Sequence, residues 1–289
     1  MRVTTSPAEA TSRPARPGHC FVIAALALLP FALPHAQERA APLGPLDYVL
    51  DTYVRGGDVY YRALKSDRGR LDAYVNQLAN VDVDKLSRNE QIAFWLNAYN
   101  ALVLRTAIDH YPAPRRSNEY PERSIRQVPG AFEKLPRRVA RRTLTLDQIE
   151  QTILPTFADP RLYFAIGRGA VGGGRLRSEA FTAAALETQL AEVASECLSR
   201  AQCVHIDPAG NRLEASPIFS WREKEFVAAY AGKVAPPYQA RSPIERAILA
   251  YVQPKLLQTE RDFLEKNTFQ LAFRPFDWSL NDLTERGGR

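Results

Sequence analysis

The sequence predicts an α+β fold that is mainly helical, with a small, mostly antiparallel sheet. Segments with helical spacing of apolar residues outnumber strand-like segments. The strand-like segments lie late and irregularly along the chain instead of alternating with helices, which disfavours a doubly wound sheet. The chain has 289 residues, of which 45% are hydrophobic and 24% charged. These proportions are typical of an ordinary globular protein.

The first 36 residues are expected to be a secretory signal peptide, with a linker over 37–45. Positive charge precedes an apolar run over 20–33, and Ala36 ends the segment before polar residues. The run is shorter than the about 20 residues that a membrane span needs. Pro34 is a poor residue before a cleavage point, so an uncleaved anchor is the alternative. We expect a periplasmic or secreted protein with no transmembrane segment beyond the signal.

The clearest helix is predicted over 92–108. Ser87 and Glu90 form a capping box before it, and its apolar residues lie nearly all round, so it should be central in the core. Asn97 and Asn100 are three apart and share one face. Because a buried amide must be hydrogen-bonded, they either hold neighbouring backbone or orient a ligand group.

Further elements are predicted from periodicity and turn residues. A second capping box, Thr145 to Gln148, opens a helix that should reach Leu154. The other predicted helices span 46–54, 71–78, 186–197, 218–230 and 244–257. The predicted strands span 59–61, 162–166, 204–207, 212–215 and 271–273, with a hairpin joining the third and fourth.

A glycine-rich loop, Gly167 to Gly174, contains the pattern G-x-G-x-x-G after a predicted strand. This pattern occurs in dinucleotide-binding sites, where a helix begins within it and points its N-terminus at the pyrophosphate. Here the three glycines 172–174 would occupy that first turn and resist helix formation. We therefore expect no dinucleotide, and no other cofactor.

The most unusual composition lies in residues 115–142, with nine basic and three acidic side chains. Its densest cations are Arg137, Arg138, Arg141 and Arg142, which could bind phosphate or carboxylate groups of an anionic envelope component. Nucleic acid is not expected as a partner outside the cytoplasm. The alternative is a solvated loop that aids solubility.

Residues suited to metal binding or nucleophilic catalysis are scarce. After the predicted signal the only histidines are His110 and His205, far apart in sequence, and we expect no metal site. Cys197 and Cys203 are six positions apart. In an exported protein such a pair is predicted to form a disulfide, with two independent thiols as the alternative.

Five motifs follow one another along the chain: Phe94–Leu102 (FWLNAYNAL), Leu144–Glu150 (LTLDQIE), Asp159–Ala165 (DPRLYFA), Ser216–Trp221 (SPIFSW) and Phe276–Asn281 (FDWSLN). Together and in this order they resemble the bacterial DUF547 family. The resemblance covers residues 46–282, with a tail over 283–289, and implies a papain- or transglutaminase-like fold.

The chain departs from the family pattern at four positions. Family members usually carry histidine where this chain has Gln151 and Tyr163, and cysteine where it has Arg168 and Gly173. A cysteine nucleophile needs a base to form its thiolate, and arginine can act as neither base nor nucleophile. If the family are Cys/His enzymes, this member should be inactive by that route.

Three hypotheses follow for function. The first is a non-catalytic binding protein of the cell envelope, with a pocket lined by Arg168, Glu150, Asn97, Asn100, Tyr163 and Trp95. The second is a hydrolase or transferase in which Glu150, with a pKa raised by burial, acts with Arg168 or Asn97. The third is an interaction module that binds anions through residues 115–142.

Overall fold

The computed structural model describes residues 43–286, all within one compact unit that spans Glu38–Arg289. The predicted signal peptide, most of the predicted linker and the last three residues of the tail lie outside the described residues. No helix among residues 43–286 is long and apolar enough to cross a membrane.

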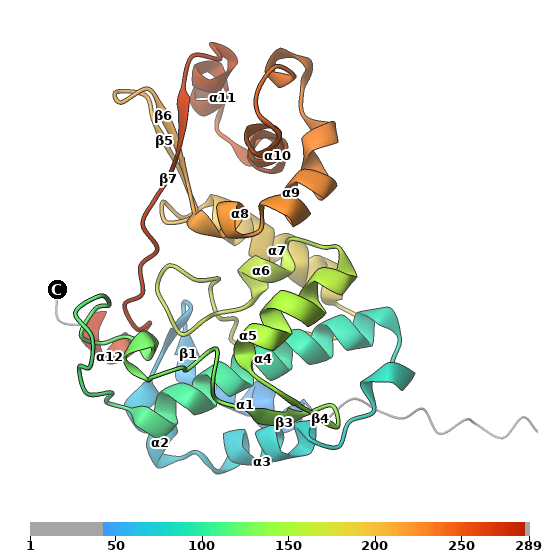
Figure 1. Cartoon of the computed structure of the whole chain (residues 1–289), viewed down its shortest axis with the longest axis vertical. Helices are drawn as coiled ribbons and strands as arrows, with labels where there is room; N and C mark the ends of the chain where they lie inside the picture. The colour runs from blue at the N-terminus through green and yellow to red at the C-terminus, as the bar shows by residue number, and fades with distance from the viewer. Residues whose placement is uncertain (1–42, 287–289) are drawn as a thin grey trace, which may run out of the picture. The chain divides into compact units, whose positions relative to one another are not determined.

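The fold is α+β and mainly helical, as predicted (Figure 1). The α-helices are α1 Gly44–Tyr53, α2 Tyr61–Ser66, α3 Gly69–Leu78, α4 Arg88–His110, α5 Leu146–Gln148, α6 Leu162–Ala165, α7 Leu186–Leu198, α8 Pro217–Trp221, α9 Glu223–Tyr230, α10 Pro243–Val252, α11 Gln258–Glu265 and α12 Leu283–Arg286. Short 3₁₀ turns separate several of them, and a π-helical turn, η3 Ile149–Ile153, follows α5.

Helix α4 is the centre of the fold, as its apolar sequence predicts. The capping box is present, because the Ser87 hydroxyl accepts from the Glu90 N–H while the Glu90 carboxylate accepts from the Ser87 N–H. Nearly every residue from Ile92 to Ile108 is buried. In Figure 1, α4 crosses the lower half of the view, and it packs against α2, α3 and α5.

The strands form three small sheets. Two are antiparallel pairs, β1 Val54–Arg55 with β2 Asp58–Val59, and β3 Arg137–Val139 with β4 Arg142–Leu144. The third is mixed: β6 Arg212–Ala215 pairs antiparallel with β5 Val204–Asp207 and parallel with β7 Gln270–Phe273. The predicted hairpin and late strand are therefore confirmed.

The strand predicted over 162–166 is wrong, because these residues form helix α6 and its C-terminal cap. Asp159 forms the turn that precedes the helix, since its side chain accepts the Arg161 N–H and its carbonyl accepts the Leu162 N–H. Leu162 to Ala165 are all buried. A short apolar run has the same sequence signature in a buried strand and in a buried helical turn, so periodicity could not distinguish them.

Other boundaries differ for local reasons. The helix predicted over 218–230 is broken at Arg222 into α8 and α9, and Pro254 ends α10 in a 3₁₀ turn. The helix predicted from Thr145 has its capping box but widens after α5 into the π-helical turn. Such turns are frequent at functional sites.

The two cysteines lie where the end of α7 meets the start of β5. The Cys197 and Cys203 sulfurs are at disulfide-bonding distance, with their Cα atoms 5.3 Å apart. Both side chains are buried, so the link joins the helix to the three-stranded sheet inside the core.

Candidate functional site

Glu150, in the π-helical turn, is the centre of a buried polar cluster. Its Oε1 atom accepts from Nη2 of Arg168 at 2.6 Å and from Nη2 of Arg222 at 3.2 Å. Its Oε2 atom accepts from the Tyr99 hydroxyl at 3.0 Å. Four elements that are distant in sequence thus meet at one carboxylate: α4, η3, the loop after α6 and the break between α8 and α9.

Arg168 reaches this carboxylate because of the conformation of its loop. The residue has φ 44°, in the left-handed region that non-glycine residues seldom adopt. Its Nη1 atom donates to the Tyr163 carbonyl at 3.0 Å, and the side chain is only 2% exposed. Asn100 holds the start of the loop, since its side chain donates to the Ala165 carbonyl and accepts the Gly167 N–H.

Arg222 completes the cluster and was not predicted from sequence. Its Nη2 atom also donates to the Glu150 carbonyl at 3.0 Å, and its guanidinium lies 4.3 Å from the centre of the Tyr163 ring. The Tyr163 hydroxyl in turn donates to Glu225 at 3.3 Å.

The two arginines decide the charge state of Glu150. Burial alone would raise its pKa, but the attraction of Arg168 and Arg222 and the hydrogen bonds from Arg168 and Tyr99 hold the pKa below its ordinary value. The second hypothesis expected a raised pKa, and that expectation is wrong. Burial and the nearby carboxylate raise the pKa of Tyr99 well above its ordinary value, so Tyr99 stays a hydrogen-bond donor.

A pocket of about 180 Å³ opens beside this cluster. We call it the aromatic pocket; its lining residues are Arg126, Phe132, Asp147, Glu150, Gln151, Arg168, Trp221 and Trp278. Two of the four family positions that this chain replaces, Gln151 and Arg168, therefore border one cavity. Tyr163, a third such position, does not line the pocket. It contacts the same cluster through its ring, which lies against Arg222, and through its carbonyl, which accepts from Arg168.

Aromatic side chains form one wall of the pocket. Trp221 stacks on Trp278 with ring centres 6.4 Å apart and an angle of 20° between the planes, and Phe276 packs against both. Trp221 is 47% exposed, a large solvent-facing area for this side chain. The Arg126 guanidinium lies 4.5 Å from the ring centres of both Phe132 and Trp278 and pairs with Glu133.

Asn97 and Trp95 do not reach this pocket. The Asn97 side chain donates to the Phe181 carbonyl and accepts the Phe181 N–H, both at 2.8 Å. Asn97 and Asn100 are thus committed to neighbouring backbone. Trp95 is buried in the core against Phe94.

Close packing accounts for the glycines at 172–174, so a bound phosphate is not needed to explain them. A Cβ atom on Gly174 would lie 1.8 Å from the Phe164 carbonyl oxygen, and one on Gly173 would lie 2.7 Å from the Gly167 carbonyl oxygen. A Cβ on Gly172 would lie 2.7 Å from the Asp277 nitrogen. No helix begins within the loop, so it lacks the helix N-terminus that a dinucleotide site uses.

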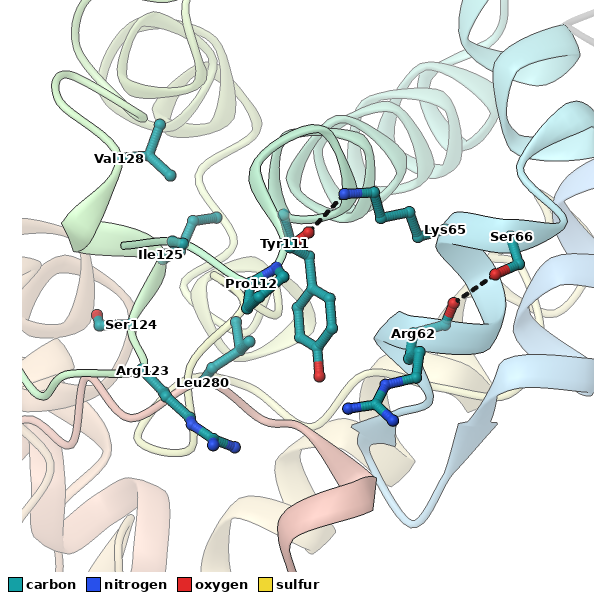
Figure 2. A pocket seen from close by; sticks show the side chains of 12 residues that line it. Arg62, Lys65, Ser66, Tyr111, Pro112, Arg123, Ser124, Ile125, Val128 and Leu280 are labelled. Carbon is teal, nitrogen blue, oxygen red and sulfur yellow. Dashed lines mark hydrogen bonds between the residues drawn. The ribbon is translucent and has the colours of Figure 1, made fainter. Parts of the chain in front are cut away.

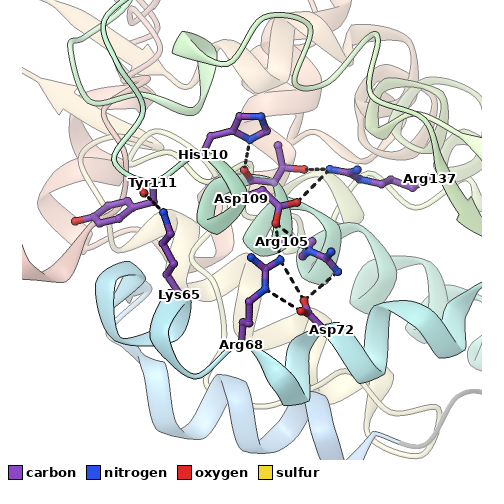
Figure 3. A network of polar contacts seen from close by, with 9 residues as sticks. Lys65, Arg68, Asp72, Arg105, Asp109, His110, Tyr111 and Arg137 are labelled. Atoms are coloured by element: carbon purple, nitrogen blue, oxygen red, sulfur yellow. Dashed lines mark hydrogen bonds and ion pairs between the residues drawn. The ribbon is translucent and has the colours of Figure 1, made fainter.

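Three arginines of the arginine-rich segment contact acidic side chains in other parts of the chain. Arg141 pairs with Asp82 at 2.8 Å and Arg142 with Asp84 at 3.2 Å. Arg137 donates to Thr106 and lies 3.9 Å from Asp109, within the network of Arg68, Asp72, Arg105 and Asp109 that Figure 3 shows. Of the four arginines predicted to bind anions, three are thus engaged by protein groups.

Among residues 43–286 no group of three or more His, Cys, Asp or Glu side chains is placed to hold a metal ion.

The sequence missed Arg126, Arg222, Trp221 and Trp278 as site residues. The two tryptophans lie in the last two segments of the family resemblance, which was the available signal. Arg222 carried no signal, because arginine on a helix or loop is usually a solvated side chain. Arg126 lies in the segment 115–142, which was predicted to bind anions and not to border this pocket.

Comparison with known proteins gives one match. Residues 83–198 match the family model described as "Protein of unknown function, DUF547". The match is shorter than the resemblance over 46–282 and includes Glu150 and Arg168, but not Trp221, Arg222 or Trp278. No curated protein and no solved structure matches the chain significantly, so the papain- or transglutaminase-like fold remains a prediction.

Proposed function

We propose that the chain carries a DUF547 domain with a non-catalytic binding site, and that the protein is an exported binding protein of the cell envelope; the family match over residues 83–198 supports the first part. The site is the aromatic pocket beside Trp221 and Trp278. Its ligand is a neutral sugar ring of an envelope saccharide.

One observation carries the non-catalytic part of this proposal: the contact of 2.6 Å between Arg168 and Glu150 inside the protein. It holds Glu150 as a carboxylate, and three donors occupy its oxygens. An ionised and fully hydrogen-bonded carboxylate is a poor general acid and a weak base. Arg168 stands where the family usually has cysteine, and it supplies neither a nucleophile nor a base.

The lining of the pocket supports a sugar as ligand. The side chains of Trp221 and Trp278 supply apolar surface that a sugar ring can contact, while Asp147 and Gln151 offer hydrogen bonds to hydroxyl groups. The volume of about 180 Å³ lies below the ~300–1,000 Å³ of sites for drug-sized ligands, which favours a single ring.

The charges and donors of the pocket support a neutral ligand. Glu150 and Glu133 pair with Arg168 and Arg126, so each cation in the lining has a partner. A neutral ligand leaves both ion pairs intact, and its hydroxyl groups can hydrogen-bond to Asp147 and Gln151 without adding charge.

The test is a titration of the protein with glucose, galactose, N-acetylglucosamine and oligomers of the last, followed by tryptophan fluorescence at low and high salt. At least one sugar should change the fluorescence saturably, with an affinity independent of salt. Trp221→Ala should abolish binding. Leu257→Ala is the matched control, because it removes another exposed apolar side chain, 69% exposed and away from the pocket lining, and should bind normally.

Two results would count against the proposal. Absence of saturable binding by any sugar, or equal binding by Trp221→Ala, would reject the pocket as a saccharide site. Turnover of a bound sugar that is lost in Gln151→Ala would reject the non-catalytic assignment. Export is tested separately: expression in a Gram-negative bacterium should give periplasmic protein whose N-terminus follows Ala36.

A further inference from the structure

A second and larger cavity lies away from the aromatic pocket and shares no lining residue with it. We call it the basic cavity; its volume is about 470 Å³, within the ~300–1,000 Å³ range of small-molecule sites. Figure 2 shows its walls, which come from α2, the end of α4 and the segment that follows α4. Its lining residues are Arg62, Lys65, Ser66, Ala107, Tyr111, Pro112, Ala113, Arg123, Ser124, Ile125, Val128 and Leu280.

One part of the lining is apolar. Ala107, Ile125 and Val128 are buried core residues, each no more than 6% exposed, and they present their remaining surface to the cavity together with Pro112 and Leu280. An apolar surface of this kind binds hydrocarbon, because transfer of the hydrocarbon out of water is favourable.

The other part of the lining is cationic. Arg62, Lys65 and Arg123 line the cavity, and none of its lining residues is acidic. Lys65 donates one hydrogen bond to the Tyr111 carbonyl, while an ammonium group has three donors. In the view of Figure 2 the guanidinium groups of Arg62 and Arg123 lie on either side of the Tyr111 hydroxyl.

The nearest acid to Tyr111 is already engaged. Asp282 accepts from the Tyr111 hydroxyl at 2.6 Å and from the N–H and hydroxyl of Thr284. It is 2% exposed and does not line the cavity. The charge that faces the cavity itself is therefore positive.

We propose that the basic cavity binds a small amphiphilic anion. Its carboxylate or phosphate head lies on the cationic side of the cavity, which Arg62, Lys65 and Arg123 line, and its hydrocarbon body lies on Ile125, Val128 and Leu280. Both parts are required, because the cations select the head group and the apolar wall binds the body. The proposal is independent of the saccharide site, since none of its residues lines the aromatic pocket.

Calorimetric titration of the full-length protein with decanoate and with decyl phosphate, below their micelle concentrations, tests this proposal. At least one should bind saturably with one site, and should bind at least about tenfold more tightly than decanol, acetate or inorganic phosphate. The two head groups distinguish a fatty-acid ligand from a phospholipid-like one. Binding should weaken as salt rises, because the head-group contacts are near the surface.

Variants locate the site. Arg62→Gln with Lys65→Gln should weaken binding at least about tenfold. The matched control, Lys224→Gln with Lys255→Gln, removes two exposed cations elsewhere and should bind within twofold of the unmodified protein. Ala113→Leu, which fills the cavity without changing charge, should weaken binding of the ten-carbon anion, while Trp221→Ala should leave it unchanged.

The proposal is overturned if decanol binds as tightly as the anions, because the cations would then have no role. It is also overturned if inorganic phosphate binds as tightly as decyl phosphate, since the apolar wall would then have no role. Absence of binding, or equal binding by the Arg62 and Lys65 double variant, rejects the site. Loss of binding in Trp221→Ala alone would show that the ligand binds in the aromatic pocket and not in the basic cavity.

Discussion

The Nη2 atom of Arg168 lies 2.6 Å from Oε1 of Glu150, and both side chains are buried where they border the aromatic pocket. Eighteen positions separate the two residues in the chain, and Arg222 joins them from still further away. Desolvation makes a buried ion pair costly to assemble, but removal of one partner is worse, because the remaining charge is left buried and uncompensated.

Glu150→Gln should therefore strongly destabilise the protein. The change leaves the buried Arg168 guanidinium without a carboxylate and Arg222 with only Glu225, 3.7 Å away, which we expect to lower the free energy of unfolding by about 3–5 kcal/mol. Chemical denaturation at neutral pH measures the loss. The control is Glu187→Gln: Glu187 pairs with Arg161 at 2.6 Å but its side chain is 80% exposed, so the loss should be below about 1 kcal/mol.

Arg168→Met in the Glu150→Gln background should restore part of the lost stability, since it removes one uncompensated charge and keeps an apolar stem. Additive losses in the double variant would contradict the direct coupling of the two residues.

Stability should fall in acid partly through Glu150. Its pKa in the folded protein lies below the ordinary value of 4.5. The unfolded chain therefore binds this proton first as the pH falls, so the contribution of Glu150 is fully present above that value and is lost as the pH passes down through the folded pKa. The difference in unfolding free energy between unmodified protein and Glu150→Gln should shrink over this window. Other acids titrate there too, but they contribute to both proteins and cancel in the difference.

The glycine-rich loop should tolerate no added methyl group at Gly174. A Cβ there would lie 1.8 Å from the Phe164 carbonyl oxygen, a backbone atom held within the buried helix α6, so Gly174→Ala should lower the melting temperature sharply. Gly232→Ala is the matched control, since nothing lies within 4 Å of its Cβ position. It should be neutral or stabilise by about 0.4–1 kcal/mol through the unfolded state. Equal effects of the two changes would contradict the close packing of the loop.

Reduction of the disulfide should have a moderate effect. The chain-entropy account gives about 2 kcal/mol for a loop this short. Mass spectrometry after alkylation in denaturant should find Cys197 and Cys203 protected until a reductant is added, and denaturation with and without reductant measures the stability. If both cysteines alkylate in the denatured, unreduced protein, the pairing is wrong. Cys197→Ala with Cys203→Ala should match the reduced protein and should not respond to reductant.

Local signals were sufficient for much of the fold. The capping boxes at Ser87 and Thr145 fixed where two helices begin, because these hydrogen bonds lie within four residues of one another. The β5–β6 hairpin was predicted for the same reason. Helix α6 was not predicted, because four buried apolar residues suit either a helical turn or a strand. Only the tertiary structure shows that no strand pairs with these residues.

By itself the sequence determined the α+β class and the central position of α4, and it predicted that Cys197 and Cys203 pair, with two independent thiols as the alternative. Its resemblance to DUF547 indicated that Arg168 and Gln151 stand where the family usually has cysteine and histidine. Tertiary structure alone decided that Arg168 and Arg222 share one carboxylate, and that Trp221 and Trp278 stand beside it. The physical reason is the distance along the chain over which each kind of interaction acts. Helix caps, turns and periodicity act between near neighbours, whereas the partner of a buried charge is set by packing between elements that meet only after the chain has folded.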